Sequence, residues 1–222
     1  MTPRYDTISF LSDFGTDDEL VGVVKGVLRG LAPHATVIDV THGIPSFDVR
    51  AGGLALARAV QYLPAGVVLA VVDPGVGTER RAVAIEVAGG EMVFVGPDNG
   101  LLASAVAMLG GAERAVAITN QDLRLTAPGV TFGARDIFGP AAAHLANGGA
   151  FEELGADVDV FSLLPGVLPV AERRGDRLEA EVLWVDRFGN VQLNIGLDDL
   201  EGMGDVLAMR FHESLRTARL AS

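Results

Sequence analysis

The stretch that decides the fold reads VVLAVVDPGVGTER and spans residues 67–80. Its first six residues are apolar, which predicts a strand at 67–72 that is buried on both faces of a sheet. Asp73 follows this strand directly, and a loop with two glycines leads to Arg80. Because ligands of parallel sheets bind beyond the carboxyl ends of the strands, the stretch predicts both an architecture and a candidate site.

Strands and helices alternate on the N-terminal side of this stretch. The spacing of apolar residues predicts strands at 8–12 and 36–40 and helices at 20–31 and 49–62. Thr16 and Glu19 stand at capping-box spacing, so we expect Thr16 to cap the first helix. The alternation predicts an α/β N-terminal domain with a mostly parallel sheet that helices cover on both faces.

The pattern changes toward the C-terminus. Before the change, the sequence predicts a hairpin at 82–87 and 92–95 and a helix at 135–147. Glycine and proline without helical periodicity then predict a linker, and the segments beyond it are short strands at 177–186, 191–195 and 206–211. The expected organisation is an α/β domain at 1–160, a linker at 161–176 and a smaller, mostly-β C-terminal domain at 177–222.

The composition bounds the class of protein. The chain has 222 residues, of which 49% are hydrophobic, and a net charge of −12. It contains no cysteine, which excludes disulfides, thiolate metal sites and cysteine nucleophiles. The acidic charge argues against a nucleic-acid partner, because phosphate binding needs a basic surface. A cationic small ligand suits this charge better.

Neither a secretory signal nor a membrane span is expected. The first ten residues, MTPRYDTISF, lack a basic region followed by an apolar run, and no segment approaches about 18 uninterrupted apolar residues. The four histidines lack metal-binding spacing such as HExxH. We therefore expect a cytoplasmic protein with no metal, no other cofactor and no membrane partner.

Asp73 and Arg80 are the first candidates for chemistry. Their loop can bring both side chains into one cleft, where a carboxylate can orient water and an arginine can hold negative charge. The alternative is a structural salt bridge in a tight loop, which the spacing alone favours. A dinucleotide-binding fingerprint is incomplete here, because the third glycine and the following helix are missing.

Two further motifs are candidates for ligand binding. Asp13 follows the strand at 8–12, where one carboxylate can accept hydrogen bonds from both hydroxyls of a ribose. Its alternative role is to help cap the next helix. In the motif at 186–190, Phe188 could stack on a purine while Asn190 hydrogen-bonds to the purine edge. The alternative is an ordinary glycine-containing β-turn.

Six short motifs occur in the order found in one known family. They are SDFGT at 12–16, DVTH at 39–42, VDPGVGT at 72–78, GPDNG at 96–100, TF at 131–132 with RD at 135–136, and D-x-FGN at 186–190. Each motif is weak alone, but together, over residues 8–196, they resemble the S-adenosylmethionine hydrolases. These are also called SAM hydroxide adenosyltransferases and are related to the fluorinase and chlorinase.

The resemblance implies a reaction and an assembly. Members of the family split S-adenosyl-L-methionine into adenosine and L-methionine, by attack of water or hydroxide on the ribose C5′ carbon. They form homotrimers in which the ligand lies between the N-domain of one subunit and the C-domain of the next. Since the sulfonium is an excellent leaving group, the protein mainly has to hold the oxygen in line with C5′ and tune its protonation.

The resemblance also implies six substrate-binding residues, which are Asp13, Phe47, Phe132, Asp186, Phe188 and Asn190. By the motif match, Asp13 would hold the ribose hydroxyls, and Phe47 would lie beside the ribose. Asp186 would hold the methionine ammonium, and Phe188 and Asn190 would contact adenine. Asp73 and Arg80 are the implied catalytic residues, as two members of an Asp–Arg–His triad that handles water.

Two departures from the family pattern stand out. The family motif reads Thr-Phe-His-Gly-Arg-Asp where this chain has TFGARD at 131–136, so Gly133 occupies the position of the triad histidine. Family members also continue with further C-terminal strands, so we expect a truncated C-terminal domain that lacks part of the adenine pocket.

These observations leave two hypotheses from different classes. Asp73 and Arg80 favour a hydrolase, whereas Gly133 favours a catalytically impaired protein that binds S-adenosylmethionine or adenosine. A halogenase fits less well, because Asp73 would place a negative charge beside a halide ion.

Overall fold

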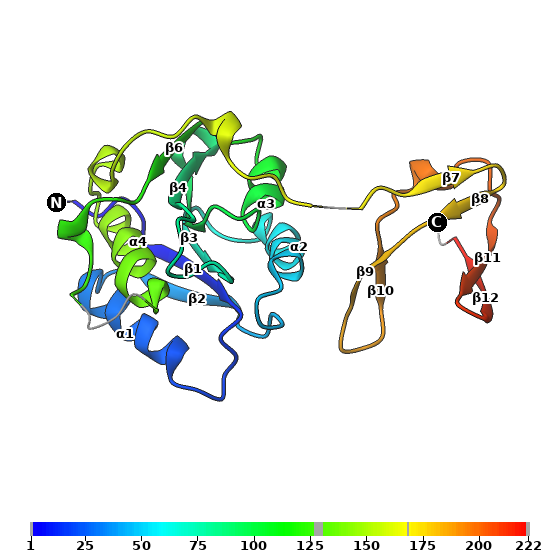
Figure 1. The fold of residues 1–222 in the computed structure, drawn as a ribbon, viewed down its shortest axis with the longest axis horizontal. Helices are drawn as coiled ribbons and strands as arrows, with labels where there is room; N and C mark the ends of the chain where they lie inside the picture. The colour runs from blue at the N-terminus through cyan, green and yellow to red at the C-terminus, as the bar shows by residue number, and fades with distance from the viewer. Residues whose placement is uncertain (1, 127–130, 168, 221–222) are drawn as a thin grey trace. The chain divides into compact units, whose positions relative to one another are not determined.

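The computed structural model describes residues 2–126, 131–167 and 169–220. The chain divides into two compact units, Met1–Val167 and Leu168–Ser222. The first unit contains a six-stranded sheet, and the second contains short antiparallel hairpins (Figure 1).

The six-stranded sheet has the strand order β2-β1-β3-β5-β4-β6. Its strands are β1 (Thr7–Ser12), β2 (Thr36–Thr41), β3 (Gly66–Val71), β4 (Ala82–Val87), β5 (Met92–Pro97) and β6 (Arg114–Ala117). The first four strands in this order are parallel, whereas β4 pairs antiparallel with both β5 and β6. The predicted mostly parallel sheet is therefore confirmed.

Helices cover both faces of this sheet. α1 (Leu20–Leu31) packs with α4 (Gly139–Ala146) on one face, and α2 (Val49–Val60) packs with α3 (Ala103–Met108) on the other (Figure 1). β1 and β3 are buried along their whole length, which the apolar sequence of β3 predicts. An apolar core that includes Phe10, Leu28 and Phe138 joins the sheet to the α1–α4 pair.

The predicted start of α1 at Leu20 is confirmed, but its predicted cap is wrong. The helix begins at Leu20 with Glu19 as its N-cap and has no capping bond from that side chain. Thr16 lies in a bend about one turn earlier, so the capping-box pattern falls in an exposed loop. α2 does have a side-chain cap, because the Asp48 carboxylate accepts a 2.9 Å hydrogen bond from the Ala51 N–H.

The helix predicted at 135–147 is divided in two. A π-helical turn (Ala134–Phe138) comes first, and α4 follows with Pro140 in its first turn. The Gly139 N–H closes the π-helical turn on the Ala134 carbonyl oxygen. A Cβ atom at position 139 would lie 2.8 Å from that oxygen, so the close approach requires a glycine.

Further helical turns are short. They are η1 (Ala88–Gly90), η2 (Gln121–Leu123), η4 (Phe151–Leu154), η5 (Val160–Ser162) and η6 (Asp198–Leu200). Within the described part of the chain, no helix has both the length and the apolar character needed to cross a membrane.

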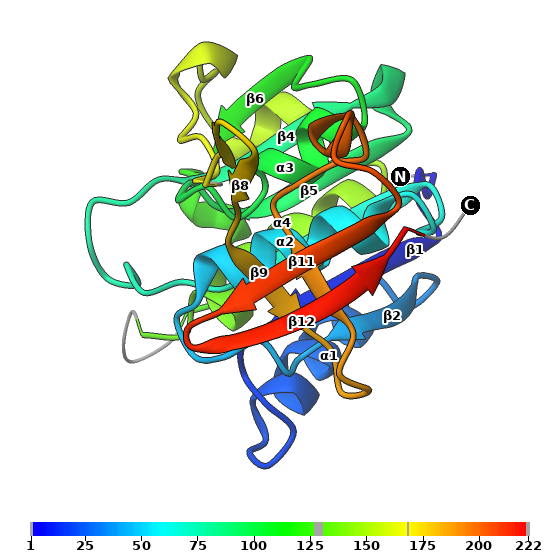
Figure 2. The same ribbon diagram turned by 90° about the vertical axis from the view of Figure 1, so that its right-hand side faces the viewer.

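The second unit consists of antiparallel hairpins, as its short strands predict. They pair β7 (Glu172–Arg174) with β8 (Arg177–Glu179), β9 (Val182–Val185) with β10 (Val191–Leu193), and β11 (Val206–Phe211) with β12 (Ser214–Arg219). The β11–β12 hairpin is drawn in orange and red in Figure 2. The long strand expected at 177–186 is interrupted between β8 and β9, and β7 and β12 are additional strands.

Apolar side chains of the second unit have little cover within it. Among its described residues, 169–220, none is buried, and Val185, Phe188 and Leu197 are more than half exposed. Because hydrophobic stabilisation grows with the apolar area that is buried, this unit gains little from its own packing.

Candidate active site

Two candidate carboxylates lie at the same edge of the six-stranded sheet. Asp13 follows β1 and Asp73 follows β3, and these two strands are parallel neighbours. The carboxyl ends of parallel neighbours meet at one edge, which is where this class of sheet binds ligands. The topology therefore brings the two predicted positions to one region of the first unit.

Asp73 and Arg80 form a two-pronged ion pair. Arg80 Nε donates to Asp73 Oδ1 at 3.0 Å, and Arg80 Nη2 donates to Asp73 Oδ2. The Gly75 N–H adds a 3.1 Å hydrogen bond to Asp73 Oδ1, and Thr78 Oγ1 closes the loop on the Gly75 carbonyl at 2.7 Å. Both charged side chains are largely buried, at 5% and 14% exposure. Paired charges of this kind need each other, because either alone would be costly to bury.

Gly133 and Arg80 both lie next to the aromatic ring of Phe138. The Arg80 guanidinium carbon lies 5.3 Å from the centre of the Phe138 ring. A Cβ atom at Gly133 would lie 3.3 Å from Cε2 of the same ring. The backbone of Gly133 is right-handed helical, with φ −57° and ψ −32°, which any residue can adopt. The backbone conformation therefore does not require glycine at this position.

Asp13 and Phe47 are joined by a hydrogen bond. The Phe47 N–H donates to Asp13 Oδ2 at 2.7 Å. Phe47 has a positive φ of 65°, unusual for a residue with a side chain, and the residue is 65% exposed. The structure thus places the carboxylate predicted to bind ribose beside the aromatic residue predicted to flank it.

Phe132 reaches the same region through an aromatic contact. Its ring meets the Phe14 ring edge-on, with 5.6 Å between the centroids. The Phe132 ring also contacts Arg135, whose guanidinium carbon lies 5.2 Å from the centre of the ring. Arg135 in turn makes hydrogen bonds of 2.6 and 2.8 Å to the two carboxylate oxygens of Asp136. The TFGARD motif is therefore tied to the turn that carries Asp13.

The remaining predicted residues form one turn of the second unit, between β9 and β10. Asp186 Oδ1 accepts hydrogen bonds of 2.8 Å from the N–H groups of Phe188 and Asn190, and Asn190 Nδ2 donates to Asp186 Oδ2 at 2.7 Å. The hydrogen bond from the Asn190 side chain is the main cause that lowers the pKa of Asp186. Phe188 is 82% exposed.

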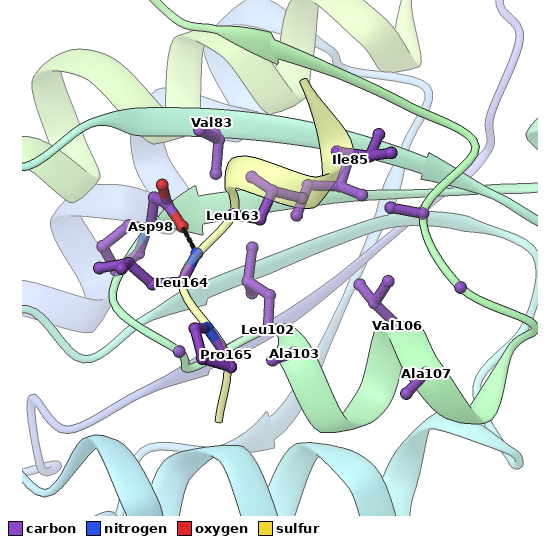
Figure 3. A pocket seen from close by; sticks show the side chains of 15 residues that line it. Val83, Ile85, Asp98, Leu102, Ala103, Val106, Ala107, Leu163, Leu164 and Pro165 are labelled. Atoms are coloured by element: carbon purple, nitrogen blue, oxygen red, sulfur yellow. Dashed lines mark hydrogen bonds between the residues drawn. The ribbon is translucent and has the colours of Figure 1, made fainter. Parts of the chain in front are cut away.

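The first unit contains a cavity with a different lining. It has a volume of about 200 Å³ and is lined by Val83 of β4, Leu102 just before α3 and Leu163 just after η5, among others (Figure 3). The buried Asp98 carboxylate accepts a 2.9 Å hydrogen bond from the Leu164 N–H at its wall. None of the predicted site residues lines this cavity.

Two polar residues next to the site have no role in the sequence-based hypothesis. Ser12 and His42 are both buried, and Ser12 Oγ lies 2.8 Å from His42 Nδ1. Their motifs, SDFGT and DVTH, are recognisable in the sequence, but the contact depends on how β1 and β2 pair. Among the described residues, no group of three or more histidine, aspartate and glutamate side chains is placed to hold a metal ion.

Comparison with known proteins points to one family. The family model described as SAM hydroxide adenosyltransferase N-terminal domain matches residues 8–155. An (R)-S-adenosyl-L-methionine hydrolase from Salinispora tropica is 51% identical over 186 residues, which cover 84% of this chain and 70% of that protein. An (R)-S-adenosyl-L-methionine hydrolase from Thermus thermophilus is 49% identical over 198 residues, which cover 86% and 73%.

A solved structure shares the fold of this chain. The crystal structure of an uncharacterized conserved protein from Thermotoga maritima matches with a TM-score of 0.85 and 34% identity, and the match covers 97% of this chain and 82% of that one. The six-motif resemblance is confirmed by the family model and by both hydrolases. This chain belongs to the SAM hydroxide adenosyltransferase family.

Proposed function

We propose that this chain hydrolyses S-adenosyl-L-methionine to adenosine and L-methionine. Its family, and relatives at about half identity that are named as hydrolases of this substrate, support the activity. The observation that carries the proposal is the buried Asp73–Arg80 pair at the carboxyl end of β3. A fixed carboxylate paired with a fixed cation is suited to orient a water molecule and to favour its hydroxide-like form.

The proposed chemistry is a single displacement at C5′. The water oxygen forms a bond to C5′ while the C5′–S bond breaks, and the bonding electrons return to sulfur, which leaves as the neutral thioether of methionine. One of the two water protons passes to solvent, and the other stays on the new 5′-hydroxyl of adenosine. Because hydroxide attack on a sulfonium neutralises charge, a site poor in water favours the transition state. Asp73 and Arg80 supply position and electrostatics for the oxygen.

The proposed ligand contacts come from both units of the chain. Asp13 holds the ribose hydroxyls, with Phe47 beside the ribose and Phe132 next to the same turn. Asp186 binds the methionine ammonium, and its lowered pKa supports this role because it favours the ionised form. Phe188 and Asn190 contact adenine.

We further propose a cytoplasmic homotrimer with the site between the N-terminal domain of one subunit and the C-terminal domain of the next. The proposed domains are 1–160 and 177–222, joined by 161–176. The exposed apolar residues of the second unit support an assembly, since subunit contact would bury them. Light scattering at micromolar protein tests this proposal, and a monomer would contradict it. We propose no cofactor, nucleic-acid or membrane partner.

A product analysis tests the activity. The protein is incubated separately with the (R) and (S) sulfonium epimers of S-adenosyl-L-methionine, and the products are separated by chromatography. The names of the relatives support the (R) epimer as a substrate of this chain. Adenosine and methionine in equal amounts are expected. Formation of S-adenosylhomocysteine would instead indicate methyl transfer and would overturn the proposal.

Gly133 favours one second candidate, a binding protein with impaired catalysis. This glycine stands where the family motif has its triad histidine, and it offers no side chain to water. Binding of adenosine without any turnover would support this candidate over the hydrolase. A halogenase is disfavoured, because the Asp73 carboxylate would repel a halide ion at the reacting position.

A further inference from the structure

A chain of polar contacts lies beside Asp13 and has no part in the proposed reaction. It joins Asp39 on β2, His42 just after β2, and Ser12 at the end of β1. His42 Nε2 lies 3.2 Å from Asp39 Oδ1, in an orientation short of a straight hydrogen bond, and Ser12 Oγ lies 2.8 Å from His42 Nδ1. The Phe14 N–H donates to Ser12 Oγ at 3.3 Å.

The direction of these contacts follows from their donors and acceptors. Because a main-chain N–H only donates, Ser12 Oγ accepts from Phe14 and can give its own proton to His42 Nδ1. The proton of a neutral His42 ring then sits on Nε2, which faces Asp39. Burial acts to raise the pKa of Asp39, but the hydrogen bond from Lys25 and the close approach of the His42 ring outweigh it and lower that pKa, so the carboxylate stays ionised.

These residue types also occur in nucleophilic triads, but the burial of Ser12 excludes that role. Its exposure is 0%, and its hydroxyl oxygen is engaged by Phe14 and His42. A serine nucleophile has to reach its substrate. The contacts therefore have a structural role, which is to hold the neighbouring chain in place.

The turn that carries Asp13 is the part they hold. His42 fixes it on both sides of Asp13, through its ring to Ser12 and through its carbonyl oxygen, which accepts a 2.8 Å hydrogen bond from the Gly15 N–H. The Phe47 N–H fixes the Asp13 carboxylate itself. A carboxylate that meets two neighbouring hydroxyls needs a defined position and rotation, which these contacts provide.

We propose that His42 and Ser12 are positioning residues that aim the Asp13 carboxylate at the ribose hydroxyls of the ligand. This inference rests on the ribose-binding role proposed for Asp13. The atom that matters is the acceptor at His42 Nδ1. Without it, the Ser12 hydroxyl loses its buried partner, and the turn loses one of its two fixed points. Recognition of the ribose hydroxyls then falls, while contacts to the rest of the nucleoside remain.

A matched pair of variants isolates that acceptor. The amide of His42→Asn places an oxygen near the Nδ1 position, where it can accept from Ser12, whereas the amide of His42→Gln reaches toward Asp39 instead. Both variants lose the same contact between the His42 and Phe10 rings, whose centroids lie 4.6 Å apart. His34→Gln, at the other end of β2, serves as a control outside the site.

Calorimetry compares the affinities of these proteins for adenosine and 2′,3′-dideoxyadenosine. The unchanged protein and the His34→Gln control are expected to prefer adenosine by at least about fivefold, the value of one lost polar contact. His42→Asn is expected to keep most of this preference, and His42→Gln to lose it. Full preference in His42→Gln, or equal loss in both variants, would overturn the positioning role alone. No preference in the unchanged protein would overturn the Asp13 role and this inference together.

Two further measurements keep the inference open to refutation if a variant folds poorly. Ser12→Ala is combined with Asp13→Ala, and its effect on adenosine affinity is expected to vanish in that background, whereas additive losses would contradict action through Asp13. In the unchanged protein, proton–nitrogen NMR of the His42 ring is expected to show the proton on Nε2. A proton on Nδ1 of a neutral ring would overturn the proposed direction of the contacts.

Discussion

The Phe47 N–H and the Asp13 carboxylate are joined by a 2.7 Å hydrogen bond. Phe47 holds a left-handed backbone conformation, which costs about 1–2 kcal/mol for a residue with a side chain. Asp48, the next residue, caps α2. Asp13 therefore helps to hold the loop that leads into α2, in addition to any contact it makes with a ligand.

This double role gives the first prediction, for Asp13→Ala. The variant should lose about 1–3 kcal/mol of adenosine binding, because ribose hydroxyls would be left without an acceptor. Asp13→Asn is the control, since its amide oxygen can still accept from the Phe47 N–H while the charge is absent. Calorimetry measures both. Unchanged affinity in a folded Asp13→Ala protein would leave Asp13 with a structural role only.

Asp73→Asn should reduce turnover far more than ligand affinity. The amide keeps the shape and can still accept from the Gly75 N–H, but it removes the charge that pairs with Arg80. A loss confined to turnover marks an interaction made in the transition state. Steady-state kinetics measures the turnover, and calorimetry with adenosine measures the ligand affinity. A thermal melt is needed as well, because an unpaired buried Arg80 should also lower stability.

Equal turnover in Asp73→Asn and the unchanged protein would make the ion pair a structural feature of the loop. Arg80→Lys offers a second comparison. It keeps a positive charge but cannot form the two parallel hydrogen bonds to Asp73, so it separates charge from geometry.

Gly133→His should raise turnover, by as much as the roughly 10²–10⁴-fold that a general acid or base typically contributes. The backbone at Gly133 suits histidine, and the added Cβ requires the Phe138 ring to move by only a few tenths of an ångström. Gly133→Ala is the control, because it adds the same Cβ without an imidazole. A high rate in the unchanged protein with no gain in Gly133→His would show that another group fills this role.

The turn at 186–190 should respond to acid. The lowered pKa of Asp186 means that the folded turn favours the ionised carboxylate. Its contribution is present above the unfolded pKa, about 3.9, and is lost as the pH falls through the lower value of the folded turn. NMR of the Phe188 and Asn190 amides should follow this loss. Asn190→Ala should raise the pH at the midpoint of this transition. Amide signals that do not change with pH would contradict the hydrogen-bonded turn.

The sequence predicts the α/β layers because apolar pattern and layer position agree. β3 is uniformly apolar, and both β1 and β3 are buried along their whole length. The hairpin β11–β12 shows where such reasoning stops. Its turn contains His212, with a positive φ of 50°, rather than the asparagine or glycine that usually indicates a tight hairpin. The second strand, Ser214–Arg219, is also largely polar, so neither its pattern nor its turn predicts it.

Some contacts of the candidate site can likewise be predicted from the sequence, and others cannot. Asp73 and Arg80 are close in sequence, so a short loop suffices to predict that they can meet. Ser12 and His42 are far apart in sequence, and their contact depends on the register of β1 and β2. That register shifts between Phe10 and Leu11, which pairs Leu11 with Thr41 at the strand ends. A local pattern contains no information about such a shift.

The fastening of η5 by Arg81 and Asp98 has a consequence for proteolysis. Arg81 bonds to the carbonyl and hydroxyl oxygens of Ser162, and Asp98 accepts from the Leu164 N–H. Beyond this point, Val167 and Val170 are at least 80% exposed. Proteases cut accessible chain that can extend into their clefts. Limited digestion should therefore cleave between Leu164, whose N–H bonds to Asp98, and the start of β7 at Glu172. The fragment that survives would carry the six-stranded sheet, and its mass would measure where the first domain ends.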